Sequence, residues 1–152
     1  MKRRITDTEY KALAEFRYRI RRFLHLSEGF ARAADLEPQQ HQLLLAIRGL
    51  PEGREATIGE LAERLQLQHH STAELIDRAE ERGLVRRARG ELDRRQVFVR
   101  LTRDGAERLR QLSIHHRDEL RSEGPALVRA LESLMRDEPD DRVSIATCRR
   151  RR

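Results

Sequence analysis

Apolar side chains recur along this chain with two different periods. Over about 8–34, 38–50, 58–65, 69–82, 102–122 and 126–135 they recur every three or four residues, which is the period of an amphipathic helix. Between Gly83 and Thr102 the period shortens to two, and the second half of this segment alternates Val97, Val99 and Leu101 with Gln96, Phe98 and Arg100. The pattern predicts six helices and, after the fourth, a β-hairpin with one apolar face.

Local signals predict where the helices begin and end. Pro38 suits the first turn of the second helix, and Gly83 suits the C-terminal stop of the fourth. Thr57 and Glu60 have the spacing of a capping box, in which Thr57 caps the third helix and Glu60 returns the bond. Gly124-Pro125 predicts a break that separates the fifth helix from a last helix at about 126–135.

This order predicts a mainly α fold with a small β-hairpin wing, a winged helix-turn-helix flanked by long N- and C-terminal helices. The terminal helices, about 8–34 and 102–136, are too long for a domain of this size unless they pack on a neighbour, so we expect them to form a homodimer. We expect a single domain over 1–136 with a DNA-binding lobe at about 38–101. Residues 137–152 are predicted to be a basic, flexible tail.

Composition agrees with an elongated dimer that binds a polyanion. The 152 residues are 38% hydrophobic and 4% aromatic, which is a lean core for one compact domain. The net charge is +6, but the four terminal arginines, Arg149–Arg152, supply four of these charges and leave +2. The positions of the other arginines therefore say more about a nucleic-acid partner than the total does.

The single cysteine, Cys148, excludes an intramolecular disulfide and fits a reducing compartment. Its arginine neighbours favour the thiolate, but we interpret it as a bystander in the tail. No apolar run resembles a signal peptide or a membrane span. We expect a cytoplasmic protein without a membrane partner.

The loop of the hairpin carries the most informative charges. Gly90, Asp93, Arg94 and Arg95 lie between the two strands, and a thin ribbon with arginines at its tip suits the minor groove of a DNA duplex. The helices before it have the order of a helix-turn-helix, whose second helix enters the major groove. The sequence therefore predicts a protein that contacts two grooves of double-stranded DNA.

Several motifs resemble the MarR family of winged-helix transcription regulators. The segment from Leu75 to Val85 carries the resemblance, together with a wing pattern of Asp-x-Arg, Leu-Thr and a Gly three residues later, here Asp93, Arg95, Leu101, Thr102 and Gly105. The motifs span about Leu36 to Gly105, and the rest of the chain resembles the family only in helix order. The chain departs from the family at Gln66, Gln68 and Ala79, where Gly, Ser and Leu are usual. The resemblance implies a homodimer, a repressor and, in many members, release from DNA by a small phenolic or carboxylate ligand.

The start of the predicted recognition helix supplies the candidate base contacts. Gln68 could read adenine, Glu74 could accept from cytosine, and His69 and His70 could donate to bases or phosphates. Ser71 and Thr72 are candidates for phosphate contacts or for the helix start. Further phosphate candidates are Arg54, Arg78 and the helix N-terminus that Thr57 caps. Each of these residues could instead be solvated near DNA.

In the wing, Arg94 and Arg95 compete for the minor groove. The family pattern favours Arg95, with Asp93 orienting it through a charge-assisted hydrogen bond. The alternative is that Asp93 and Arg95 only brace the hairpin.

An effector pocket is the second candidate site. The resemblance places it between the first, second and fifth helices, where Arg17, Tyr18, Arg21, His25 and His41 could bind an aromatic carboxylate. These residues could equally belong to a dimer interface or to the surface.

Metal and catalytic sites are not expected. His25, His41, His115 and His116 invite a metal hypothesis, because the zinc-responsive branch of the family has ligands at comparable positions. Gln40 and Leu112 stand where further ligands would be needed, so we expect no metal and no cofactor. Hydrolase, nucleotide-binding and zinc-protease motifs are missing from the sequence, and we expect no enzyme.

We therefore expect a homodimeric, sequence-specific DNA-binding repressor with a pseudo-palindromic operator and a small-molecule effector as a possible ligand. The alternatives are a winged helix used for protein contacts and a nonspecific DNA-binding protein. The polar start of the recognition helix argues against protein contacts.

Overall fold

The computed structural model describes residues 5–136. The predicted basic tail, with Cys148 and Arg149–Arg152, lies outside the described residues. Five helices and one hairpin follow each other along the chain: α1 (Asp7–Ala33), α2 (Pro38–Arg48), α3 (Ile58–Leu65), α4 (His69–Glu81), β1 (Val85–Arg89), β2 (Val97–Leu101) and α5 (Arg103–Met135). The predicted fold class, a mainly α winged helix-turn-helix with long terminal helices, is confirmed.

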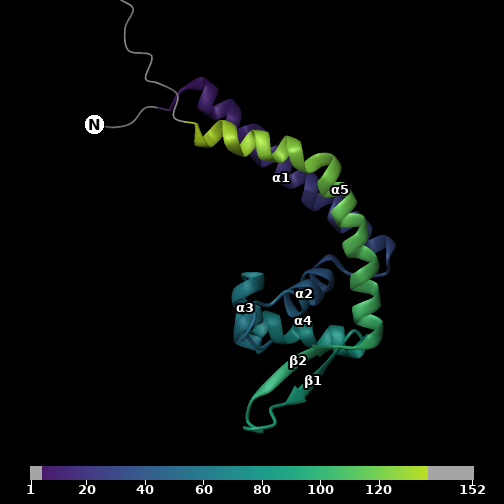
Figure 1. The fold of residues 1–152 in the computed structure, drawn as a ribbon. Coiled ribbons are helices and arrows are strands. Elements are labelled where there is room, and N and C mark those ends of the chain that lie inside the picture. The colour runs from purple at the N-terminus through teal and green to yellow at the C-terminus, as the bar shows by residue number, and fades with distance from the viewer. Residues whose placement is uncertain (1–4, 137–152) are drawn as a thin grey trace, which may run out of the picture.

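The molecule has an arm and a lobe (Figure 1). In the arm, α1 and the second half of α5 lie side by side, and they form the most extensive helix packing in the described chain. The first half of α5 leads from this arm to the lobe, where α2, α3, α4 and the hairpin gather. The lobe has a closed apolar core whose largest fully buried side chains include Leu43, Leu44, Leu61, Leu75, Ile76, Leu84 and Val99.

The predicted break at Gly124-Pro125 is wrong, because α5 continues through both residues to Met135. A proline inside a helix removes one backbone hydrogen bond and would by itself favour a kink or an end. Here the helix is held by its packing on α1, and Phe23 and Leu26 of α1 line one small cavity with Leu120 and Leu127, which stand on either side of the proline. Arg22 Nε also reaches Glu123 Oε2 at 3.3 Å. Packing along the arm overrides the local signal.

The start of α3 confirms one half of the predicted capping box and corrects the other. Thr57 Oγ1 accepts a hydrogen bond from the Glu60 backbone N–H at 3.1 Å, as predicted. Glu60 does not return it, because its carboxylate accepts from Arg54 and Arg64, each at 3.2 Å. The backbone N–H of Thr57 donates instead to the Glu55 carbonyl oxygen at 2.8 Å.

Two tight turns set the angle between the helices of the lobe. Gln66, at the end of α3, has a left-handed backbone with φ 54°, which explains why glycine is usual there. Its side-chain amide donates to the Glu63 carbonyl oxygen at 2.7 Å and closes the turn. Gly83, with φ 68°, ends α4 in the same way. The sequence had predicted this stop.

The hairpin is antiparallel, and its base is fixed to α4 and α5. Val85 pairs with Leu101 and Arg89 with Val97, so Val85 and Val99 face the core and are buried. The Thr102 backbone N–H donates to the Leu84 carbonyl at 3.1 Å, and Thr102 Oγ1 accepts from the Gly105 N–H at 3.0 Å to cap α5. Gly105 packs so closely on Leu84 that a Cβ would overlap its carbonyl group. The Leu-Thr-x-x-Gly pattern therefore joins α4, the hairpin and α5.

Substituting Gly105 with alanine is expected to destabilise the fold by about 1–3 kcal/mol or more, because a backbone carbonyl cannot move aside as a side chain can. The free energy of unfolding in urea measures this effect. Gly29→Ala is the matched control, since Gly29 is helical and a Cβ there has no atom within 4 Å. The Gly29→Ala variant should be more stable than the wild type by up to about 1 kcal/mol, because alanine has the higher helix propensity. Equal stability of the two variants would contradict the assigned role of Gly105.

Candidate nucleic-acid interface

The first turns of α4 present a polar face to solvent. Gln68, His69, His70, Glu74 and Arg78 are all exposed, and His70, Glu74 and Arg78 follow each other at intervals of four residues on one side of the helix. The opposite side carries Leu75, Ile76 and Ala79, which are buried. The lobe thus anchors α4 by its apolar side and leaves the polar side free to enter a groove.

Thr72 is not available for DNA, although the sequence placed it among the contacts. Its side chain is 0% exposed, and its hydroxyl donates to the Gln68 carbonyl oxygen at 3.0 Å. Thr72 therefore secures the first turn of α4 from the inside, which is the helix-start role that the sequence left open. Ser71 is half-buried beside it.

An open hollow of about 500 Å³ lies between α3, α4 and the hairpin. Thr57 and Gly59 at the start of α3, His69 at the start of α4, and Val97 at the start of β2 are among its lining residues. A phosphate strand running from α4 toward the wing would meet the α3 N-terminus here. Arg54 also lines this hollow, but Glu60 holds its guanidinium, so part of its charge is already neutralised.

The tip of the wing leaves its two arginines without a carboxylate partner among the described residues. Arg94 and Arg95 are both exposed, as the minor-groove hypothesis requires. The predicted side-chain bond between Asp93 and Arg95 is wrong, because Asp93 Oδ1 accepts from the Arg95 backbone N–H at 2.9 Å. Gly90 permits the tight loop, since a Cβ there would lie 2.6 Å from the Asp93 carbonyl oxygen. Asp93 therefore shapes the turn and leaves the Arg95 side chain free.

A residue that the sequence analysis missed, Arg87, ties the hairpin to α4. Its guanidinium bonds to Asp77 and Glu80 on α4, each at 2.6 Å, and its backbone N–H donates to Glu80 at 2.9 Å. This backbone bond, followed by the guanidinium, lowers the pKa of Glu80. The sequence did carry a signal for this link. Arg87 lies in a strand that begins four residues after the last residue of α4, and the last turns of α4 carry the acidic residues Asp77 and Glu80. The ion pairs fix the wing relative to the recognition helix.

A second missed cluster connects the end of α4 with the arm. Arg82 donates to Gln40 Oε1 at 2.8 Å and to Asp35 Oδ2 at 2.9 Å, and Arg108 on α5 reaches the same Asp35 oxygen at 3.4 Å. Asp35 has a left-handed backbone with φ 55°, which turns the chain between α1 and α2. The cluster joins α1, α2, α4 and α5 at one point.

The five candidate effector residues do not line a common cavity in the described chain. Arg17, Tyr18, Arg21 and His25 are exposed on α1, whereas His41 is 2% exposed inside the lobe. The small cavity between α1 and α5 is lined by other residues, including Arg19, Phe23 and Leu127. A pocket built from these five residues is therefore not present within one protomer.

His41 instead forms a buried pair with His116, whose ring centroid lies 4.6 Å away. The Nε2 atoms of both rings and Nε2 of Gln40 are buried and have no hydrogen-bond partner among residues 5–136. Burial, reinforced by His116, lowers the pKa of His41 to about 4, and burial also lowers the pKa of His116. Within residues 5–136, no three histidine, cysteine or acidic side chains are grouped to hold a metal ion.

The buried His41 predicts an acid-sensitive fold. Its ordinary pKa is 6.5 and its folded value is about 4, so between these values the unfolded chain binds a proton that the folded chain excludes. The free energy of unfolding should therefore fall by about 3 kcal/mol as the pH drops through this window. Urea unfolding of His41→Gln should show a flatter pH dependence than the wild type. Exposed His25→Gln is the control, and equal slopes for all three proteins would refute the assignment.

An exposed recognition helix, an arginine-tipped hairpin and a helix-turn-helix core define a winged helix-turn-helix protein. The MarR family model matches residues 34–96, which confirms the resemblance seen in the sequence. The matched residues, which make up less than half of the chain, are thus similar to the MarR family, and the described chain as a whole has a winged-helix fold.

Solved structures agree with this assignment. AbsC, a MarR family transcriptional regulator from Streptomyces coelicolor, is 29% identical with a TM-score of 0.68, over 80% of this chain and 82% of its own. The repressor CouR, solved on a 23-mer DNA duplex, is 26% identical with a TM-score of 0.58, over 76% and 85%. A MarR family protein from Bacillus stearothermophilus shares the fold at 23% identity and a TM-score of 0.67, over 87% and 96%.

No curated protein matches the chain. The comparisons support a DNA-binding regulator of transcription. In the described part of the chain, no helix has both the length and the apolar character that crossing a bilayer requires.

Proposed function

We propose that this protein is a homodimeric, sequence-specific repressor of transcription, in which α4 reads the major groove and the wing reads the adjacent minor groove. The observation that carries the proposal is the pairing of two exposed elements by Arg87. The polar face of α4 and the exposed arginines of the wing tip belong to two elements that are joined directly, because Arg87 of the hairpin bonds to Asp77 and Glu80 of α4. CouR, which resembles this chain, is described as a repressor bound to DNA.

The proposed contacts fall into three groups. His70 and Glu74, with Gln68 and His69, meet base edges in this proposal, which their exposure on α4 supports. Arg78, Ser71 and the α3 N-terminus capped by Thr57 are placed to meet phosphates, with Arg54 as a weaker candidate because of Glu60. Arg94 and Arg95 enter the minor groove, where narrow A·T-rich sequence concentrates negative potential.

A homodimer would cover the apolar side chains that the arm exposes. The large hydrophobic residues of α1 and α5 that are 40–74% exposed include Tyr10, Leu13, Leu24, Ile114, Leu120, Val128, Leu131 and Met135. An unpartnered strip of this kind along two packed helices is typical of a subunit interface. Two copies related by a two-fold axis would place their two reading heads, each made of α4 and the wing, on the same face of the dimer. The operator should therefore be a pseudo-palindrome with half-sites about one helical turn apart.

The domain division follows from the same arrangement. The lobe of residues 38–101 binds DNA and the terminal helices join the protomers, within one domain over 1–136. Regulation by a small phenolic or carboxylate ligand would act at the arm, where Arg17, Tyr18, Arg21 and His25 lie exposed on α1 and a second protomer could complete the site. A cytoplasmic location suits this function.

The wing arginine gives the sharpest test of the proposal. Arg95→Ala should weaken operator binding and should reduce the slope of log K against log salt concentration by about one unit per protomer. The reason is that each protomer loses one positive charge that displaces a counterion from the DNA. Fluorescence anisotropy with a selected duplex at several salt concentrations measures both effects. Arg110→Ala is the control, since Arg110 is exposed on α5 and its ion pair is with Glu107 of the same helix. Unchanged affinity and slope for Arg95→Ala would remove Arg95 from the interface.

A further inference from the structure

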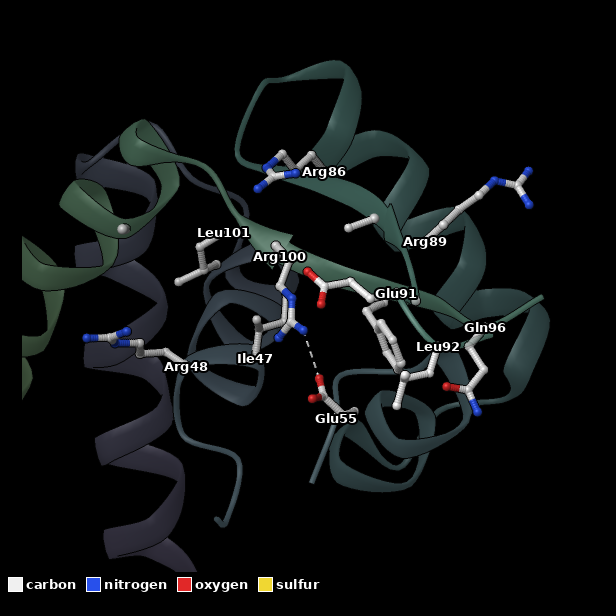
Figure 2. A pocket seen from close by; sticks show the side chains of 14 residues that line it. Ile47, Arg48, Glu55, Arg86, Arg89, Glu91, Leu92, Gln96, Arg100 and Leu101 are labelled. Atoms are coloured by element: carbon white, nitrogen blue, oxygen red, sulfur yellow. Dashed lines mark hydrogen bonds and ion pairs between the residues drawn. The ribbon is translucent and has the colours of Figure 1, made fainter. Parts of the chain in front are cut away.

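The hairpin has a second polar face, which the proposed groove contacts do not use. Because side chains alternate along a strand, Arg87 points toward α4 and its neighbours Arg86 and Ala88 point the other way. Their cross-strand partners, Arg100 and Phe98, lie on the same side. Together with Ile47 and Arg48 from the end of α2, these residues line an open hollow of about 920 Å³ (Figure 2).

This hollow is strongly basic. Four arginines line it, Arg48, Arg86, Arg89 and Arg100, against two glutamates, Glu55 and Glu91. Of these four, Arg100 is neutralised by Glu55 at 2.9 Å (Figure 2). Its guanidinium also lies over the Phe98 ring, 5.5 Å from the centroid. Within residues 5–136, Arg48, Arg86 and Arg89 have no ion pair with a carboxylate, and Arg89 donates to the backbone carbonyl oxygen of Arg94.

The contrast between the two faces of the hairpin indicates what this charge is for. On the α4 side, Arg87 is matched by two carboxylates and serves the fold. On the outer side, Arg48 and Arg86 are exposed and make no side-chain hydrogen bond or ion pair within the described chain. Uncompensated cations fixed on a strand and a helix end, around an open hollow, suit an extended anion rather than the protein's own carboxylates.

We propose that this outer face of the wing binds the phosphate backbone of DNA flanking each half-site. The inference rests on the proposed function, in which α4 lies in the major groove and the wing tip in the next minor groove. In that arrangement the face of the hairpin turned away from α4 faces the part of the duplex beyond the operator. Arg48 and Arg86 then contact flanking phosphates when the duplex curves toward the lobe. These contacts add affinity and salt dependence without adding sequence preference.

The test compares two duplexes with the full-length protein. The core duplex ends one base pair beyond each minor groove that a wing tip occupies, and the extended duplex adds about ten base pairs of arbitrary sequence, or one turn, at each end. With two arginines from each of two protomers, the extended duplex should give a log K against log salt slope steeper by up to about four units. Its affinity advantage over the core should fall by up to about 250-fold between 50 and 200 mM salt.

The double variant Arg48→Ala/Arg86→Ala separates the flank contacts from the operator contacts. It should bind the core duplex like the wild type and should lose the advantage of the extended duplex. Arg32→Ala/Arg110→Ala removes the same charge from exposed ion pairs within α1 and within α5 and should keep that advantage.

Each remaining outcome contradicts one of the two proposals. Equal wild-type affinity for both duplexes would overturn the flank assignment and leave the hollow to a different occupant, such as an acidic protein segment. Loss of core binding in the Arg48→Ala/Arg86→Ala variant would place these arginines inside the operator interface and would also overturn it. Failure of the wild type to bind any duplex would refute the proposed function itself.

Discussion

The close approach of Gly105 to the Leu84 carbonyl is the constraint on which the rest of the molecule depends. At this point α4 has just ended at Gly83, β1 is about to begin, and α5 starts under the Thr102 cap. The recognition helix, the wing and the long helix of the arm therefore meet at one backbone contact. A side chain at position 105 would separate them, and the angle of the reading head to the arm would change.

Two polar clusters extend this junction in opposite directions. Toward the tip of the wing, Arg87 joins the hairpin to two carboxylates of α4, and these are the two elements that we propose to read the grooves. Toward the arm, Arg82 joins α4 to the turn at Asp35 and, through it, to Arg108 of α5. A change in the packing of the arm would reach α4 through this cluster. In the proposed homodimer, the spacing between the two DNA-binding lobes would then change when a ligand binds at the arm.

The sequence predicted the elements that local chemistry decides and missed those that depend on distant partners. The hairpin, the stop at Gly83 and the exposed face of α4 follow from periodicity and turn residues. The break at Pro125 was predicted wrongly, because the packing of α1 on α5 keeps the helix continuous. From the sequence, Thr72 is a candidate for contact with DNA, yet its hydroxyl donates a hydrogen bond to the Gln68 carbonyl oxygen at the start of its own helix. Arg87 and Arg82 were missed because their carboxylate partners come from other elements, and no regular spacing along the chain indicates such pairs.

The measurement that tests the account most directly is selection of bound duplexes from a random DNA pool with the full-length protein. If α4 and the wing act as one body in each protomer of a two-fold symmetric dimer, the selected duplexes should contain an inverted repeat with half-sites about one helical turn apart. An A·T-rich step should lie at a constant distance outside each half-site. Enrichment of a half-site at variable distance from that step would show that α4 and the wing do not act as one body. Binding without any enriched sequence would contradict a sequence-specific regulator.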